Sequence, residues 1–263
     1  MKAWKRIHIT KKRAACGVLG LLLLAAAYMG VPRAAEKVFA VAEGERRLPI
    51  YCVQTDKPQV SVSFDAAWGA DDTDELLRIL KENDVKATFF LCGYWVEKYP
   101  EEVKKIAAEG HDLGNHSATH PHMSRISSEE IAQELQKCHE NVKKLTGVEM
   151  ELFRPPFGEY DNHVIETAEQ NGYYTIQWDV DSLDWKEQGA EAEIRQVLEH
   201  KHLGNGSIIL FHNDAKYTPK VLDTILKGIK EKGFEIVPIS QLIHRENFEM
   251  DHEGRQILKG KEA

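Results

Sequence analysis

The sequence has no excess of basic residues and few cysteines. Its 34 lysines and arginines are outnumbered by 42 aspartates and glutamates, a formal net charge of −8, which argues against nucleic acid as a partner. Four cysteines occur among 263 residues without any Cys-x-x-Cys pair, so neither a zinc ribbon nor a redox motif is indicated. We assign no disulfide. With 42% apolar residues, the chain can form one domain with a sizeable core.

Acidic residues are absent from positions 1–33, and charged residues of either sign are absent from positions 14–31. An apolar run of this length is close to the ~17–25 residues that span a bilayer as a helix. The positive-inside rule places the basic segment 1–13 in the cytoplasm, so we expect a single-pass anchor in the cell membrane with the rest of the chain outside. A secretory signal cleaved after Ala35 or Ala42 is the alternative.

The rest of the chain alternates apolar runs with amphipathic stretches. After a linker and lead-in strand at 32–57, strands are expected at Val60–Asp65, Lys86–Cys92, His111–Asn115, Leu152–Pro155, Tyr174–Asp179, Ser207–His212 and Glu235–Pro238. Helices with capping or stop signals are expected between them, at 73–81, 100–108, 127–147, 161–170, 190–200 and 218–232. This alternation predicts a parallel β/α fold, either a barrel or a doubly wound sheet. The charged, aperiodic tail at 246–263 is expected to be loose.

Polar side chains follow several of the predicted strands at the point where each strand ends. They are Asp65, His116, Arg154, Asp181 and His212. In a closed β/α barrel the carboxyl ends of all strands meet at one mouth, whereas in an open sheet they spread along a line. Because so many chemical groups would meet at one mouth, we predict a distorted (β/α)7-type barrel over 58–245.

One pair of residues has the spacing of metal ligands. His116 and His120 are four positions apart just after a predicted strand, so both imidazoles can reach one ion. A lone His-x-x-x-His arises often by chance, and each of the other polar residues has a structural explanation as a turn former, a surface charge or a strand-end histidine. The joint position of all of them at successive strand ends is what indicates a site.

The order of these motifs resembles that of the polysaccharide deacetylases of carbohydrate esterase family 4, which carry a NodB homology domain. The resemblance covers about Val60 to Ile243. In chain order the motifs are Ser63-Phe-Asp-Ala-Ala-Trp68, His116-Ser-Ala-Thr-His120, Arg154-Pro-Pro-Phe-Gly158, Asp181-Ser-Leu-Asp-Trp185 and Leu210-Phe-His212. The Phe-Asp-Ala-Ala-Trp-Gly variant, together with the N-terminal anchor, is most similar to the sporulation-associated branch of the family.

The resemblance implies a hydrolase that removes N-acetyl groups from a cell-wall glycan, and peptidoglycan is the expected substrate. It implies a divalent metal, with zinc expected, held by His116 and His120. Asp65 matches the catalytic base, and Arg154 would pair with it and keep it ionised. The backbone N–H of Phe157 would help to hold the oxyanion.

The fourth and fifth motifs supply the proton donor. His212 matches the residue that protonates the departing amine, and Asp184 would orient its ring and favour the charged form. Trp185 would form an apolar wall beside the substrate, and Asp181 is assigned to the same side of the site.

One position departs from the family pattern. The usual third metal ligand is an aspartate where this chain has Ala66, and catalytic zinc normally has three protein ligands. Either another acid substitutes, with Asp71 and Asp72 nearest, or the metal binds weakly, or it has been lost. Both aspartates also suit the role of N-cap before Thr73.

Three functions therefore remain open from the sequence. The leading hypothesis is a membrane-anchored N-deacetylase of peptidoglycan. The second is a catalytically impaired glycan-binding or morphogenetic protein that keeps the barrel, and Ala66 is the residue that supports it. The third is a hydrolase of another C–N bond, because a fold does not determine the substrate.

Overall fold

The computed structural model describes residues 46–260, and the compact unit discussed below begins at Arg47. The predicted membrane segment at 14–31 and its basic flank at 1–13 lie outside the described residues. Within 46–260, no helix combines the length and the apolar character needed to cross a bilayer.

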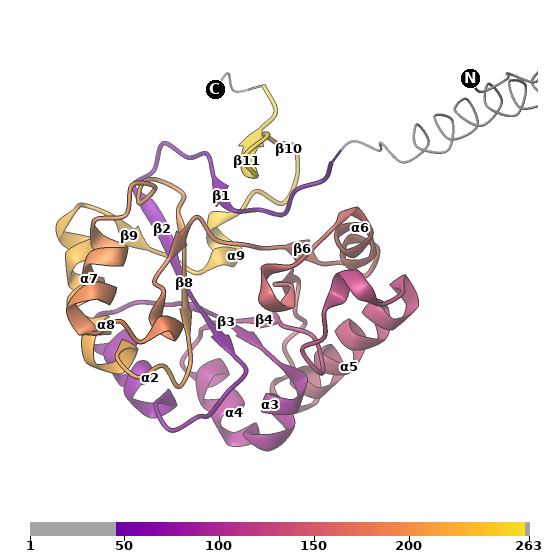
Figure 1. The fold of residues 1–263 in the computed structure, drawn as a ribbon, viewed down its shortest axis with the longest axis horizontal. Helices are drawn as coiled ribbons and strands as arrows, with labels where there is room; N and C mark the ends of the chain where they lie inside the picture. The colour runs from indigo at the N-terminus through magenta and orange to yellow at the C-terminus, as the bar shows by residue number, and fades with distance from the viewer. Residues whose placement is uncertain (1–45, 261–263) are drawn as a thin grey trace, which may run out of the picture. The chain divides into compact units, whose positions relative to one another are not determined.

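A parallel sheet forms the centre of this unit, and helices surround it (Figure 1). Along the sheet the strand order is β6-β5-β4-β3-β2-β8-β7, and β9 pairs with β2 outside this path. The strands are β2 (Gln59–Ala66), β3 (Thr88–Leu91), β4 (Asp112–Asn115), β5 (Leu152–Phe153), β6 (Tyr174–Thr175), β7 (Val180–Asp181), β8 (Ile208–His212) and β9 (Glu235–Ile236). The parallel β/α architecture predicted from the sequence is thus confirmed.

The sheet forms a half-barrel of parallel strands, which confirms the predicted distorted (β/α)7-type barrel in part, since the sheet is not closed. One strand was expected at Tyr174–Asp179, but this stretch and the two residues after it form two strands, β6 and β7. These lie at opposite edges of the sheet and do not pair with each other. The stretch crosses from one edge to the other, because Tyr174 N–H donates to the Glu151 carbonyl beside β5 while Asp179 N–H donates to the Ile208 carbonyl on β8. Between them, Gln177 N–H donates to the Ile50 carbonyl at 2.7 Å. The lead-in segment around Ile50 therefore pairs with the middle of this stretch, where a neighbouring strand would otherwise lie.

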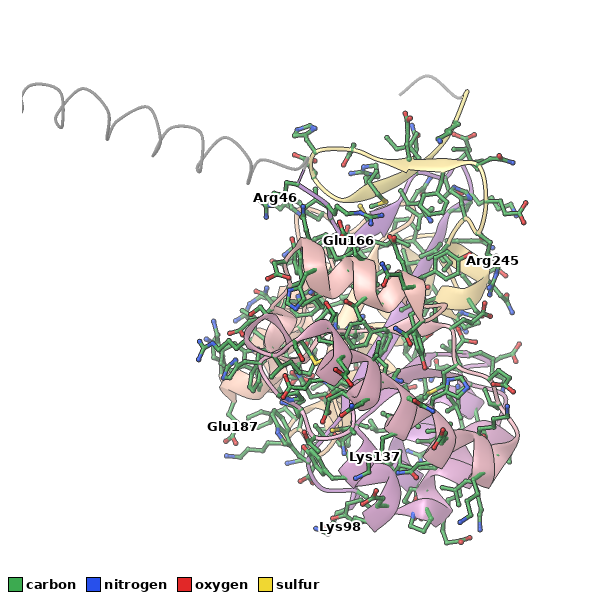
Figure 2. All side chains as sticks on the ribbon, turned by 90° about the vertical axis from the view of Figure 1, so that its right-hand side faces the viewer. Arg46, Lys98, Lys137, Glu166, Glu187 and Arg245 are labelled. Atoms are coloured by element: carbon green, nitrogen blue, oxygen red, sulfur yellow. The ribbon has the colours of Figure 1, made fainter. Side chains whose placement is uncertain are left out.

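The helices follow the strands at nearly the expected positions. They are α2 (Thr73–Glu82), α3 (Gly93–Lys98), α4 (Pro100–Ala108), α5 (Ser128–Thr146), α6 (Asn162–Gln170), α7 (Ala190–Leu198), α8 (Thr218–Glu231) and α9 (Ile239–Leu242), with short 3-10 turns η1 (Met123–Arg125), η2 (Pro156–Gly158) and η3 (Asp184–Lys186). Lys137 on α5 and Glu166 on α6 are labelled in Figure 2, and these exposed side chains pair with Glu97 and Arg47.

The ends of α5 are those that the sequence predicts. Ser127 Oγ accepts a hydrogen bond from Glu130 N–H, and the Glu130 carboxylate accepts one from Ser127 N–H, so the capping box is present. Gly147 ends the helix with φ of 76°, a left-handed conformation that glycine adopts at low cost.

Aromatic packing on one face of the sheet sets the register that matters for function. Phe64 on β2 is in register with Phe89 on β3 and Phe211 on β8, and its ring centroid lies 4.9 and 5.6 Å from theirs. Successive side chains on a strand point to opposite faces. The next pair in register, Asp65 and His212, therefore faces the inside of the half-barrel.

The C-terminal tail is not loose, and the expectation for 246–263 is wrong over its described part. A small second sheet has the order β1-β11-β10, made of β1 (Cys52–Val53), β11 (Arg255–Leu258) and β10 (Phe248–Met250). Gln256 is fully buried, and its side-chain amide bonds both the N–H and the carbonyl of His244. The domain predicted over 58–245 thus extends at both ends. β1 is only two residues long and its partner β11 is distant in sequence, so no local pattern marks it, whereas β10 and β11 are an antiparallel pair of neighbours that the sequence analysis missed.

Candidate active site

A cavity of about 550 Å³ lies where the parallel strands end, within the ~300–1,000 Å³ that is usual for ligand sites. Residues predicted from the sequence that line it are Asp65, His116, His120, Phe157, Asp181, Trp185 and His212. Arg154 and Asp184 are buried behind this wall, and each is bonded to a lining residue. The structure therefore brings together the residues predicted for catalysis.

Asp65 is held at the end of β2 by a buried ion pair. Arg154 Nη1 donates to Asp65 Oδ1 at 2.7 Å, and Nη2 donates to Ser63 Oγ at 2.9 Å. The guanidinium is fully buried and lies 4.1 Å from the ring centroid of Phe90. Burial raises the pKa of the Asp65 carboxyl, but the charges of Arg154 and of two nearby histidines outweigh it, so the pKa lies below its ordinary value. Asp65 is therefore ionised, and its Oδ2 is not used by the arginine.

His212 is held in a similar way on the neighbouring strand. Its Nδ1–H donates to Asp184 Oδ1 at 2.7 Å, and its backbone N–H donates to Asp184 Oδ2. Burial lowers the pKa of His212, but the hydrogen bond and charge of Asp184, with the charges of Asp65 and Asp181, outweigh it and hold the pKa above its ordinary value. This bond leaves Nε2 for the cavity, so His212 can carry a proton to a bound molecule.

His116 and His120 present the nitrogen atoms that a metal requires. His116 Nδ1–H donates to the Arg154 carbonyl at 2.8 Å, which leaves Nε2 unprotonated and 3.7 Å from Asp65 Oδ2. The centroids of the two histidine rings are 4.9 Å apart. Burial lowers the pKa of His116, and burial is also the main cause that lowers the pKa of His120 to about 4. Both rings are therefore neutral, as metal ligands must be.

The loop that carries these histidines is held by Glu134 on α5, a residue that the sequence analysis missed. The Glu134 carboxylate accepts hydrogen bonds from Ala118 N–H at 2.9 Å, Thr119 N–H at 2.7 Å and Thr119 Oγ1 at 2.8 Å. Ser117 and His120 have φ of 66° and 58°, so the loop is tightly curved. No motif marks Glu134, because its contact depends on how α5 packs.

The third metal position has no protein donor. Ala66 is buried and its methyl group packs in the core. Neither Asp71 nor Asp72 lines the cavity, and Asp72 Oδ2 accepts a hydrogen bond from Asp214 N–H at 2.8 Å. The structure therefore does not place either aspartate among the cavity residues as a replacement ligand, and Asp72 makes no side-chain cap on α2. In the described part of the chain, no three His, Cys, Asp or Glu side chains are grouped to hold a metal ion. The residues present fit two positions of a divalent-metal site.

Half-exposed aromatic rings form the rim of the cavity. They belong to Trp68, Phe157 and Trp185. The Trp68 ring stacks on His212 with centroids 5.2 Å apart and planes within 15°, and Phe157 stacks on His122 at 4.4 Å. Such flat apolar surfaces match the apolar faces of sugar rings. Trp68 was missed as a site residue, although a tryptophan directly after a strand with polar residues at its end was a usable signal.

Known proteins with similar sequences agree with this geometry. A family model described as polysaccharide deacetylase matches residues 53–176. Over 191 residues the chain is 34% identical to the peptidoglycan-N-acetylglucosamine deacetylase of Bacillus cereus, a match that covers 71% of this chain and 69% of that protein. The chain belongs to the polysaccharide deacetylase family.

Other relatives of this member of the family widen the comparison. It is 36% identical over 195 residues to the uncharacterized protein YlxY of Bacillus subtilis, of which it spans 60% of the length, while 74% of this chain is covered. A solved structure of a CE4 family pseudoenzyme from Bacillus anthracis matches with a TM-score of 0.71 at 36% identity, over 74% of this chain and 68% of that one. A mutant of that pseudoenzyme with restored enzymatic activity matches with the same TM-score and identity. Activity must therefore be argued from the site itself.

Proposed function

We propose that this polysaccharide deacetylase removes N-acetyl groups from cell-wall peptidoglycan, outside a membrane to which segment 14–31 anchors it, and that it acts during sporulation. The substrate is supported by the Bacillus cereus relative, whose name specifies peptidoglycan N-acetylglucosamine. The anchor is supported by the uncharged segment behind a basic flank. The Phe-Asp-Ala-Ala-Trp-Gly sequence supports the sporulation-associated branch.

One observation carries the proposed chemistry: two hydrogen-bonded pairs present an ionised carboxylate and a protonated imidazole to the same cavity. Asp65 and His212 are in register on neighbouring strands, and each is oriented from behind by a buried partner at 2.7 Å. A general base and a general acid must both be within reach of one reacting group. The pKa of Asp65 is lowered and that of His212 is raised. At a pH between the two values, Asp65 is therefore ionised and His212 is protonated, as the reaction requires.

In this mechanism Asp65 Oδ2 takes a proton from the attacking water, and Arg154 keeps the carboxylate ionised. His212 then donates the proton on Nε2 to the departing amine, and Asp184 stabilises the imidazolium that precedes this step. Phe157 lines the cavity with φ of 59°, and we assign its backbone N–H to the oxyanion. The aromatic rim positions the sugar ring.

His116 and His120 would hold a divalent metal, with zinc expected. When bound, such an ion polarises the acetamide carbonyl and lowers the pKa of a water molecule to ~7. With Ala66 at the third position, we expect weaker binding than a three-ligand site gives.

A second candidate function is favoured by that same position. A protein that binds glycan without turning it over would keep the cavity and the aromatic rim and lack competent metal chemistry. The buried methyl group of Ala66 and the similarity to a solved CE4 pseudoenzyme support it.

Acetate release by the detergent-solubilised full chain separates the two candidates. The substrate is N-acetylated peptidoglycan fragments, with and without added zinc or cobalt, and the variants are Asp65→Asn and Ala66→Asp. The deacetylase proposal expects metal-dependent release that Asp65→Asn abolishes and that Ala66→Asp increases about tenfold or more through tighter metal binding. Ala66→Asn, of the same shape without the charge, is the matched control. Wild-type turnover at background level, with glycan retained on the protein, would establish the binding protein instead.

Topology is tested separately. Protease added outside intact cells should digest the body, from Arg47 on, and leave 1–13 protected. A soluble mature protein that begins after Ala35 or Ala42 would overturn the anchor and establish a cleaved signal.

A further inference from the structure

Behind the Asp184–His212 pair lies a carboxyl group that the proposed chemistry does not use. Glu193 on α7 is only 4% exposed and does not line the active-site cavity. Its Oε1 accepts a hydrogen bond from Thr218 Oγ1 at 2.8 Å, and its Oε2 has no partner among the described residues. Burial raises the pKa of Glu193 to about 7, with the charge of Asp184 acting in the same direction and the bond from Thr218 opposing it. Such a group changes its protonation near neutral pH.

The hydroxyl of Thr218 connects Glu193 to the active site. Thr218 begins α8 and is fully buried, with Oγ1 2.8 Å from Glu193 Oε1 and 3.3 Å from Asp184 Oδ2. A hydroxyl has one proton to donate, so it cannot serve both carboxylates at once. Which of them receives the proton depends on whether Glu193 is itself a donor.

The two protonation states of Glu193 leave Asp184 in different environments. As a carboxylate, Glu193 draws the Thr218 proton to itself and places a second negative charge behind Asp184. As a neutral acid, Glu193 donates its own proton to Thr218 Oγ1, which then turns its proton to Asp184 Oδ2. Asp184 already accepts from His212 Nδ1 and from two backbone N–H groups, of Trp185 and His212, so this donor completes its coordination.

We propose that Glu193 is a positioning residue for the proton donor His212, and that it acts through the hydroxyl of Thr218. Neutral Glu193 directs the Thr218 proton to Asp184 and makes that carboxylate a weaker base, which lowers the proton affinity of His212. Ionised Glu193 does the reverse. The catalytic meaning of this coupling rests on the proposed function, but the coupling itself does not require turnover.

The surroundings of both groups are consistent with this coupling. Asp184 on η3 is the charged group that acts on Glu193 among the described residues, and α8 contributes the neutral Thr218. His212 is faced by the carboxylates of Asp184, Asp65 and Asp181. A cavity of about 10 Å³ lined by Asp184, Glu193 and Gly189, among others, lies beside the link. It has room for about one water molecule, through which Glu193 can exchange its proton.

The test is the pKa of His212, measured by NMR on the detergent-solubilised full chain labelled with ¹³C-histidine. The resonance is assigned by its loss in His212→Gln. Glu193→Gln is permanently neutral and its amide donates to Thr218, so we expect it to lower the pKa of His212 by about 0.5–1 unit relative to the wild type. Glu191→Gln, an exposed position on the same helix, should leave the value unchanged. A structural role alone would also leave the isosteric Gln variant at the wild-type value, so a difference below about 0.2 unit overturns the proposal.

Thr218 variants test the route. Thr218→Val removes the hydroxyl at constant shape, and Thr218→Ser keeps it. Glu193→Gln should shift the pKa of His212 by less than half as much in the Val background as in the Ser background. A full shift in both backgrounds would show that the charge of Glu193 acts on His212 directly, and it would overturn the proposed route through the Thr218 hydroxyl. Acetate release by the same proteins is scored separately. An inactive wild type with the expected shifts refutes the proposed deacetylase and supports the coupling, and an active one without them refutes the coupling alone.

Discussion

The candidate active site has an acid–base half and a metal half, and they differ in how many of the expected groups are present. In the acid–base half, Asp65 and His212 each use one atom to bond a buried partner at 2.7 Å and keep another atom for the cavity. In the proposed metal half, His116 and His120 line the cavity, but Ala66, where the family motif has its third ligand, has a buried methyl group and no donor atom. The proposed acid–base half thus has all of its hydrogen-bonded partners, whereas the proposed metal half has two candidate ligands.

The difference shows that some residues of the site are required by the stability of the fold, whereas others are required only by a bound metal. Arg154 is a fully buried cation, and removing its carboxylate partner typically costs about 3–5 kcal/mol. The Asp65–Arg154 pair therefore has a structural reason to persist whether or not the protein is an enzyme. A third metal ligand has no such reason, because alanine packs at its position without leaving an unpaired charge.

The largest expected effect is that of Asp65→Asn. Asparagine keeps the shape but cannot accept a proton, so acetate release should fall by about 10²–10⁴-fold. The unfolding free energy should also fall, because Arg154 loses its counter-charge, and thermal unfolding measures this. Asp65→Asn combined with Arg154→Met removes both charges and should recover stability without recovering activity. Activity that persists in Asp65→Asn would contradict the assigned base. Where the wild type is inactive, the same comparison is made in the Ala66→Asp background.

His212→Ala should have the second largest effect, about 10²-fold on acetate release. It is smaller than that of Asp65→Asn because a proton from solvent can partly replace the lost donor in an open cavity, whereas the attacking water loses its base outright. Glycan retention, measured by co-sedimentation with insoluble peptidoglycan, should be nearly unchanged. A His212→Ala protein with full activity would show that the leaving amine takes its proton elsewhere.

Asp184→Asn tests the acid–base half through the dependence of activity on pH. Asp65 must be ionised, so activity is lost as pH falls through its depressed pKa; His212 must be protonated, so activity is lost as pH rises through its raised pKa. Asparagine at 184 removes the charge that raises the pKa of His212, and the alkaline limb should move to lower pH by about one unit. The acid limb, recorded in the same kcat profile, should stay in place. Glu187→Gln on the nearby surface is the control. An alkaline limb that does not move would mean that it belongs to another group.

Glu134→Gln should have the smallest effect, and only on the metal half. Its carboxylate holds the histidine loop by hydrogen bonds from Ala118 and Thr119. Weakening bonds of this kind is worth about 0.5–1.5 kcal/mol, so zinc affinity measured by competition with a chelator should fall about 2–10-fold. The pKa of His212 should be unchanged, as it should be in the exposed control Glu140→Gln. A shifted His212 pKa would show that the two halves are coupled.

The sequence predicted the residues of the site better than the shape of the sheet. Motifs at strand ends place Asp65, His116 and His212 correctly, because in a parallel β/α fold all such ends lie on one side. The sequence did not show that segment 174–181 crosses from one edge of the sheet to the other. That path depends on Ile50, which pairs with the middle of the segment.

What the sequence could not show depends on contacts between distant elements. Glu134 and Glu193 lie on helices at positions that amphipathic periodicity marks only as helical, and their roles come from how α5 and α7 pack against loops of the site. Ala66 is the opposite case, because its identity alone, read against the family motif, located the incomplete metal position. Neither aspartate offered as a substitute lines the cavity, and only the fold could show that.

The small sheet β1-β11-β10 has a consequence for the order in which the protein is made. β1 leaves the ribosome near the start of the domain, and its partner β11 leaves near the end of the domain. The Val53 N–H donates to the Gly206 carbonyl, and a Cβ at Gly206 would lie 1.7 Å from the Val53 carbonyl oxygen, so β1 also fits against a turn that is synthesised late. The first strand therefore waits, unpaired, for almost the entire domain to be synthesised. The two ends of this domain therefore pair last, and a chain that stops before β11 would leave β1 without its partner strand.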